Sequence, residues 1–196
     1  MSLATAIVFV LVALGFAAPQ RPVHVIVVTD LGEIEMEIDV AKAPATAGNF
    51  LKYVDAGLYD GGLFHRTVRP DNQREKPVKI AVIQGAANAT RKSEFFPPIP
   101  LERTNTTGLQ HKDGTVSMAR DARPDTATEE FFICVGDQPE LDFGGKRNPD
   151  GQGFGAFGRV VRGMDVVRRI QGSPADGETL RPPIKIIRVT RVPGRL

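Results

Sequence analysis

Residues 23–38 read Val23-His-Val-Ile-Val-Val-Thr29, then Asp30-Leu-Gly32, then Glu33-Ile-Glu-Met-Glu-Ile38, and this stretch decides the fold class. Its first part is rich in β-branched residues, and its middle part has the composition of a turn. The last part alternates charged and apolar residues with a period of two, which is typical of a strand with one buried face. Together the three parts predict a half-buried antiparallel hairpin.

Further short apolar runs follow the hairpin, separated by polar segments that contain glycine and proline. They lie at residues 63–64, 80–83, 115–119, 131–135, 157–161 and 184–192. Two helices are predicted between them, one from about Ala45 to Ala56, after Pro44 and before Gly57, and one over residues 164–170. Many short strands with only two helices favour a mainly β, mostly antiparallel closed sheet over alternating βαβ units.

The size and charge of the chain limit the classes of protein that it can belong to. It has 196 residues, of which 41% are hydrophobic and 24% are charged. This is enough material for one buried core, so we predict a single domain, at residues 23–193. The formal net charge is only +2, and nothing in its distribution calls for nucleic acid as a partner.

The N-terminal segment is an apolar run, from Ala4 to Ala18, that stops at Pro19. Residues 1–17 carry no charged side chain, and small residues stand where a signal peptidase would cut, after Ala17 or Ala18. We therefore expect a signal peptide at residues 1–17, or to 18, and an exported protein that is periplasmic or secreted. The alternative is an uncleaved segment that anchors the protein to a membrane.

The sequence offers no clear metal site or nucleophile. The only cysteine, Cys134, lies in the apolar run at residues 131–135, which predicts a buried, inert thiol and no internal disulfide. The three histidines, His24, His65 and His111, do not stand at metal-ligand spacing from one another or from Cys134. We therefore expect neither a metal nor a cofactor, and no Gly-x-Ser-x-Gly motif marks a hydrolase.

The segment Gly151-Gln-Gly-Phe-Gly-Ala-Phe-Gly-Arg-Val160 has the spacing of a glycine-rich phosphate-binding loop. A dinucleotide-binding fold would need a helix directly after it, whereas residues 156–161 have the composition of a strand. A protein kinase would need further catalytic segments downstream, and only a few dozen residues remain. The context therefore argues against nucleotide binding.

Six short motifs occur in a fixed order: Leu63-Phe-His-Arg66, Val82-Ile-Gln-Gly85, Gly114-Thr-Val-Ser-Met-Ala119, Glu130-Phe-Phe-Ile-Cys134, Leu141-Asp142 and Ala156-Phe-Gly158. Each alone is an ordinary strand with a polar end. In this combination the chain resembles the cyclophilins, over about Val25 to Val192. The resemblance implies an eight-stranded antiparallel β-barrel capped by two α-helices. It also implies peptidyl-prolyl cis-trans isomerase activity on proline-containing polypeptides, and a role in the folding of exported proteins.

Such an activity needs neither nucleophile nor metal. Rotation about a peptide bond is opposed by about 18–20 kcal/mol, because the nitrogen lone pair is shared with the carbonyl. An enzyme must bind the twisted amide better than either planar form. By resemblance, Arg66 is the catalytic residue, whose guanidinium donates a hydrogen bond to the prolyl nitrogen. Without the neighbouring motifs, Arg66 would be read as half of an ordinary surface ion pair.

The resemblance also implies a set of substrate-binding positions. Four apolar residues would form the proline pocket, Gln84 and the backbone of Arg120 would bind the substrate main chain, and the other positions lie beside them. The full set is Val82, Gln84, Ala119, Arg120, Glu130, Phe132, Leu141, Phe154, Ala81 and His65. Of these, His65 is expected to pack beside Arg66 rather than carry a proton.

Four positions depart from the family pattern. Ala81 stands for the usual pocket Phe, Glu130 for a Gln, Glu140 for a large residue such as Trp, and Phe154 for a His or Tyr. Phe154 is predicted to fill part of the space that Ala81 leaves. The segments from Arg66 to Gln84 and from Asp142 to Gly155 are also longer than usual. Without the large residue at position 140, weak cyclosporin binding is expected.

Two competing functions remain open at this point, both on a barrel. One is a non-catalytic module that binds proline-containing peptides in the altered groove. The other is a small-ligand barrel such as a lipocalin, which would need an open interior, whereas the many large apolar residues predict a filled one. We expect the protein to be a monomer.

Overall fold

The computed structural model describes residues 21–193 of the chain. The expected export signal, at residues 1–17 or to 18, lies outside the described residues. Within residues 21–193, no helix combines the length and the apolar character that crossing a membrane requires.

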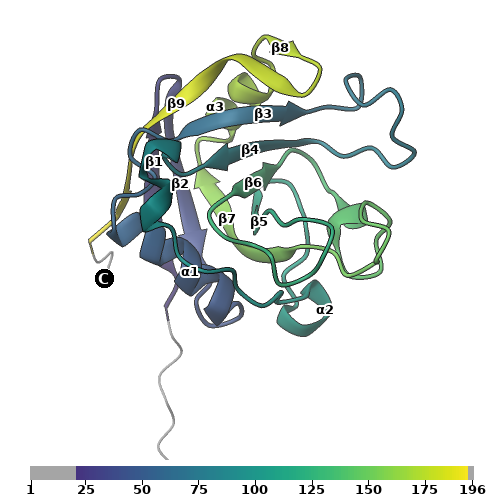
Figure 1. Ribbon diagram of the computed structural model, residues 1–196, viewed down its shortest axis with the longest axis horizontal. Coiled ribbons are helices and arrows are strands. Elements are labelled where there is room, and N and C mark those ends of the chain that lie inside the picture. Colours follow the sequence, from purple (N-terminus) through teal and green to yellow (C-terminus); the bar gives the residue numbers. More distant parts are fainter. Residues whose placement is uncertain (1–20, 194–196) are drawn as a thin grey trace, which may run out of the picture.

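Eight strands form a closed antiparallel barrel (Figure 1), which confirms the predicted architecture. Hydrogen-bonded neighbours follow the order β1-β2-β7-β5-β6-β4-β3-β9, and pairing of β1 with β9 closes the ring. The ninth strand, β8, has two residues and pairs only with β9. The strands are β1 (Val23–Thr29), β2 (Gly32–Ile38), β3 (Leu63–Val68), β4 (Val82–Ala86), β5 (Thr115–Met118), β6 (Phe131–Cys134), β7 (Gly155–Arg162), β8 (Ala175–Asp176) and β9 (Thr179–Arg191).

The N-terminal hairpin forms as predicted. Strands β1 and β2 pair antiparallel in a register that sets Val27 opposite Ile34 and Thr29 opposite Gly32. Alternate residues such as Val25 and Met36 are fully buried. The apolar residues of the alternating pattern therefore face the barrel core, because successive side chains of a strand point to opposite faces of the sheet.

The two predicted helices lie on different sides of the barrel (Figure 1). Helix α1 (Pro44–Asp55) begins with the proline, and α3 (Met164–Gln171) covers β2, β3 and β4. Three shorter segments were not predicted: α2 (Thr104–Thr107) and the 3-10 turns η1 (Ala89–Glu94) and η2 (Pro139–Leu141). They have at most six residues each, which is too short for a helical repeat of apolar residues to be visible in the sequence.

The barrel interior is filled. The rings of Phe50, Phe131 and Phe157 are fully buried. The ring centroid of Phe50 lies 5.5 Å from that of Phe131 and 5.1 Å from that of Phe157. Aromatic rings packed at this spacing leave no room for a ligand in the interior. The interpretation as a small-ligand barrel is therefore wrong, and any binding site must lie on the outside.

A second apolar cluster lies on the outer face of the barrel. In β6, Phe131 and Ile133 belong to the interior core, whereas Phe132 and Cys134 belong to this outer cluster, because neighbouring side chains point to opposite faces of a strand. Its buried members are Val68, Ile80, Val82, Phe132, Cys134 and Leu141, with Ala119 and Phe154 packed against them. This outer cluster forms the base of the candidate site.

Candidate active site

A β-bulge in β3 turns Arg66 toward the outer face. Phe64 pairs with Gly85 of β4 and Arg66 pairs with the next residue, Gln84, so that His65 is an extra residue in the ladder. Without the bulge, Arg66 would share the interior face with the fully buried Phe64. A bulge often redirects a side chain beside a functional site. The sequence alone did not reveal it, because the bulge leaves no mark on the apolar pattern.

Side chains from β4 and from the turn before β9 hold the Arg66 guanidinium. Its Nη1 donates to Gln84 Oε1 at 2.7 Å, and its Nε donates to Glu178 Oε2 at 2.9 Å. Nη2 donates to the same Glu178 oxygen. Gln84 lies on β4, whereas Glu178 stands in the turn just before β9, which pairs with the other edge of β3. The Arg66 side chain is therefore held in one position while a third of its surface stays exposed to solvent. Its partner Glu178 was not identified from the sequence.

A pocket of about 480 Å³ with an apolar base opens beside Arg66, a size in the usual range for ligand sites. The predicted residues that line it are Arg66, Val82, Gln84, Ala119, Arg120, Phe132, Leu141 and Phe154. Ala81 is not part of this lining, and Ile80 takes its place. The Ala81 N–H is bound by the Gln138 side chain at 3.1 Å, and its carbonyl accepts from Val135 N at 2.9 Å. Residue 81 thus stands just before β4, with Ile80 turned into the outer cluster.

Phe154 forms one wall of the pocket. Its ring meets that of Phe132 edge to face, with centroids 5.4 Å apart, an arrangement that aromatic rings prefer. The Arg120 guanidinium carbon lies 5.3 Å from the Phe154 centroid, and Arg120 Nε donates to the Gly153 carbonyl at 2.8 Å. Gly153 has φ of +67°, and a Cβ there would lie 2.6 Å from the Asp142 backbone, so glycine is required to present Phe154.

Glu130 and His65 lie beside the pocket rather than in it. Glu130 accepts a hydrogen bond from Gln84 Nε2, and His65 Nε2 lies 3.6 Å from a Glu130 oxygen. The neighbouring His65 holds the pKa of Glu130 below its usual value, although burial opposes this shift. Among the described residues, Glu130 makes no hydrogen bond or ion pair with Arg66 or Arg120, because Gln84 stands between Glu130 and Arg66, and Arg120 pairs with Asp150.

A Ser-His-Asp arrangement supports the pocket from below. His111 Nδ1 lies 2.7 Å from Asp142 Oδ1, and its Nε2 lies 2.9 Å from Ser117 Oγ. Ser117 is fully buried and cannot reach a substrate. His111 instead stacks on Phe132, with centroids 5.9 Å apart and ring planes 15° from parallel. The three side chains thus hold Phe132 in place and offer no nucleophile.

The other chemical predictions concern Cys134 and the glycine-rich segment. Cys134 is fully buried, and burial raises the pKa of its thiol far above the usual value, so it is inert. Residues 155–162 of the glycine-rich segment form strand β7 and not a helix, which removes the phosphate-loop interpretation. What the site does offer is a fixed guanidinium beside an apolar pocket, which suits a reaction that stabilises a twisted amide.

Comparison with known proteins agrees with this chemistry. The sequence model of the family described as cyclophilin type peptidyl-prolyl cis-trans isomerase/CLD matches residues 24–191. Peptidyl-prolyl cis-trans isomerase A of Dickeya dadantii is 37% identical over 147 residues, which cover 75% of this chain and 70% of that protein. Peptidyl-prolyl cis-trans isomerase B of Escherichia coli is 35% identical over 144 residues, covering 74% and 81%.

A solved cyclophilin type peptidyl-prolyl cis-trans isomerase of Cryptosporidium parvum shares the fold, with a TM-score of 0.67 at 19% identity. The match covers 88% of this chain and 99% of that one. The relatives favour the enzyme over the non-catalytic binding module, since they are named as isomerases. The chain belongs to the cyclophilin-type peptidyl-prolyl cis-trans isomerases.

Proposed function

We propose that Arg66 is the catalytic group and that the apolar pocket beside it binds the proline ring of a polypeptide substrate. The observation that carries this proposal is the fixed position of the Arg66 guanidinium at the edge of the pocket formed by Val82, Phe132 and Leu141. The pocket holds the ring while the preceding carbonyl rotates. As the amide twists, the lone pair localises on the prolyl nitrogen, and a donor placed there stabilises the transition state.

Arg66 has donors left for this task. A guanidinium carries five N–H groups, and three of those of Arg66 are bound by Gln84 and Glu178. One N–H on each terminal nitrogen is then available to substrate. Because the other three bonds fix the plane of the guanidinium, little side-chain entropy is lost when the substrate binds.

The proposed substrates are proline-containing segments of unfolded or exported polypeptides, handled by a monomer in the periplasm or outside the cell. A cyclophilin type isomerase from Cryptosporidium parvum that shares this fold was solved in the presence of the dipeptide Ala-Pro, with a TM-score of 0.66. The apolar run Ala4 to Ala18 supports the proposed export. N-terminal sequencing of the mature protein tests the cleaved signal: a start at residue 18 or 19 supports cleavage, and an intact N-terminus contradicts it and favours the uncleaved membrane anchor.

The catalytic role of Arg66 is tested with Arg66→Lys, which keeps the positive charge but loses the planar fork. We expect kcat/KM for a proline tetrapeptide to fall by about 100-fold, while the dissociation constant for the peptide changes by less than about threefold. Exchange NMR gives the rates and titration gives the affinity. Turnover by the Lys variant within about threefold of wild type would show that the fork is not needed.

A further inference from the structure

One rim of the proline pocket is cationic. It is formed by the loop between β3 and β4 and by the loop that precedes β7, which both extend from the same end of the barrel (Figure 1). These are the two segments that the sequence analysis found to be longer than is usual in the family. They contribute Lys76, Lys146 and Arg147 to the lining, and none of the described residues that line the pocket is acidic.

Arg147 joins the two loops. Its Nη1 donates to Gln73 Oε1 at 2.8 Å and to the Val78 carbonyl at 2.7 Å. Gln73 is itself only 2% exposed, and its Nε2 donates to the carbonyls of Arg69 and Ile80. The half-buried guanidinium of Arg147 is therefore held by a fixed part of the pocket wall.

Arg147 differs from the other arginines of the pocket in having no carboxylate partner. Arg66 pairs with Glu178, and Arg120 pairs with Asp150 at 2.9 Å. Within residues 21–193, no Asp or Glu lies within ion-pair distance of Arg147, and the same holds for the exposed Lys76 and Lys146. Among the described residues, the rim thus carries three cationic side chains without a salt-bridge partner. The carboxylate of Glu178 acts on Arg147 only from a greater distance, and Glu75 lies with Lys76 in an adjoining pocket.

The unpaired Arg147 is held where its charge is unfavourable. Burial lowers its pKa below the usual value, the nearby Arg66 adds to this, and Glu178 opposes it. A guanidinium nevertheless stays charged at any working pH, and a half-buried charge without a counter-ion destabilises a fold. Its Nε and Nη2 groups make no hydrogen bond with the described residues. These two groups form the side of a guanidinium that binds a carboxylate with two parallel hydrogen bonds.

We propose that Arg147, with Lys76 and Lys146, binds the carboxylate of an acidic residue within two positions of the substrate proline. The inference rests on the proposed isomerase function and assigns it a preferred substrate class. One continuous pocket of about 480 Å³ contains both the apolar base formed by the outer cluster and the cationic rim. It is therefore large enough for the proline ring and a neighbouring side chain together.

The charges around the groove make this preference one-sided. A smaller pocket of about 210 Å³ shares Gln84, Ala119 and Arg120 with the proline pocket. Acidic residues line it: Asp121, Glu129 and Glu130. An acidic substrate residue on that side of the proline would be repelled. We therefore expect a substrate carboxylate to be favoured on one side of the proline and not on the other.

The test uses matched peptides that differ only by Glu or Gln at one of the two positions on either side of a single proline. Exchange NMR gives kcat/KM and titration gives the dissociation constant for each peptide. For wild type, kcat/KM should be at least threefold higher with Glu than with Gln at one position, mainly through tighter binding. In Arg147→Gln the ratio should fall to about one, and in Arg147→Glu it should fall below one.

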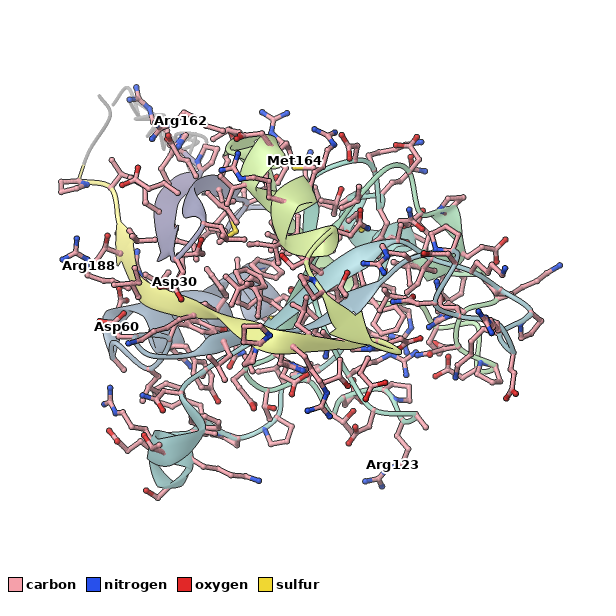
Figure 2. All side chains as sticks on the ribbon, turned by 90° about the horizontal axis from the view of Figure 1, so that it is seen from above. Asp30, Asp60, Arg123, Arg162, Met164 and Arg188 are labelled. Atoms are coloured by element: carbon pink, nitrogen blue, oxygen red, sulfur yellow. The ribbon has the colours of Figure 1, made fainter. Side chains whose placement is uncertain are left out.

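Arg123→Gln is the matched control, since Arg123 is exposed and points away from the ribbon (Figure 2). It should keep the wild-type ratio. If Arg147→Gln does not fold, Lys146→Gln and a rise in salt from about 0.05 to 0.5 M should each reduce the ratio in a folded protein. Equal rates for Glu and Gln peptides, or a ratio that survives in Arg147→Gln, would overturn the inference. Absence of turnover with every peptide would instead refute the isomerase function.

Discussion

Replacing Glu178 with alanine removes the carboxylate that binds two nitrogens of Arg66 from the turn before β9. Gln84 still binds Nη1 in this variant, so Arg66 keeps one anchor and regains rotation about its other bonds. Fixing a flexible side chain costs about 0.5–1.5 kcal/mol. When Glu178 is absent, this ordering cost is met only as Arg66 binds the transition state, which is then stabilised by that much less. We therefore expect kcat/KM to fall by about 2- to 12-fold. The loss should lie mainly in kcat, because Glu178 does not line the proline pocket.

The backbone role of Glu178 survives the substitution, since its carbonyl accepts from Thr67 N at 2.9 Å in either case. Glu178→Gln should recover most of the activity, because an amide oxygen can accept the same hydrogen bonds. Asp176→Ala is the matched control: it removes a carboxylate from the end of β8, beside the same turn, where Asp176 pairs with the exposed Arg181, and it should leave kcat/KM unchanged. The positioning role is refuted if Glu178→Ala keeps full activity, or if Gln rescues nothing.

Three further predictions concern neighbouring positions. Glu130→Gln should change kcat/KM by less than about tenfold, because Glu130 binds Gln84 and does not touch Arg66; a loss as large as that of an Arg66 variant would give Glu130 an essential role. Cyclosporin should bind weakly, since an aromatic anchor is typically worth a few kcal/mol and Glu140 offers none; calorimetry that finds nanomolar affinity would contradict this. Cys134 should react with a maleimide only after unfolding, because burial raises the pKa of its thiol, and mass spectrometry of native protein would detect an exception.

The strands and the base of the pocket could be predicted from the sequence because they follow a local rule. Alternation in the run at residues 131–135 places Phe132 on the face opposite Phe131, and the family motifs identify which face carries the site. The closed barrel follows from many short strands with few helices. Among the predicted elements only the ends moved, for example the first helix, which ends at Asp55 rather than Ala56; the short segments α2, η1, η2 and β8 were not predicted.

The partners of Arg66 and the rim of the pocket could not be predicted in the same way. Glu178 is 112 residues from Arg66 in the sequence, and no periodic pattern links a turn residue to a strand residue at that distance. Ile80, and not Ala81, lines the pocket because of where β4 begins. That point is set by hydrogen bonds of the Ala81 backbone to the Gln138 side chain and to the Val135 N–H. Arg147 lies in a loop, whose path is set by contacts rather than by residue propensity.

The catalytic role of Arg66 is tested most directly by cis-trans exchange of a short Xaa-Pro peptide, measured by NMR for wild type and for Arg66→Ala at equal concentration. The side chain lies on the outer face and is a third exposed, so the variant should fold, which the dispersion of its own spectrum shows. We expect kcat/KM to fall by about 100-fold or more. A folded Arg66→Ala protein that exchanges the peptide at nearly the wild-type rate would contradict the account.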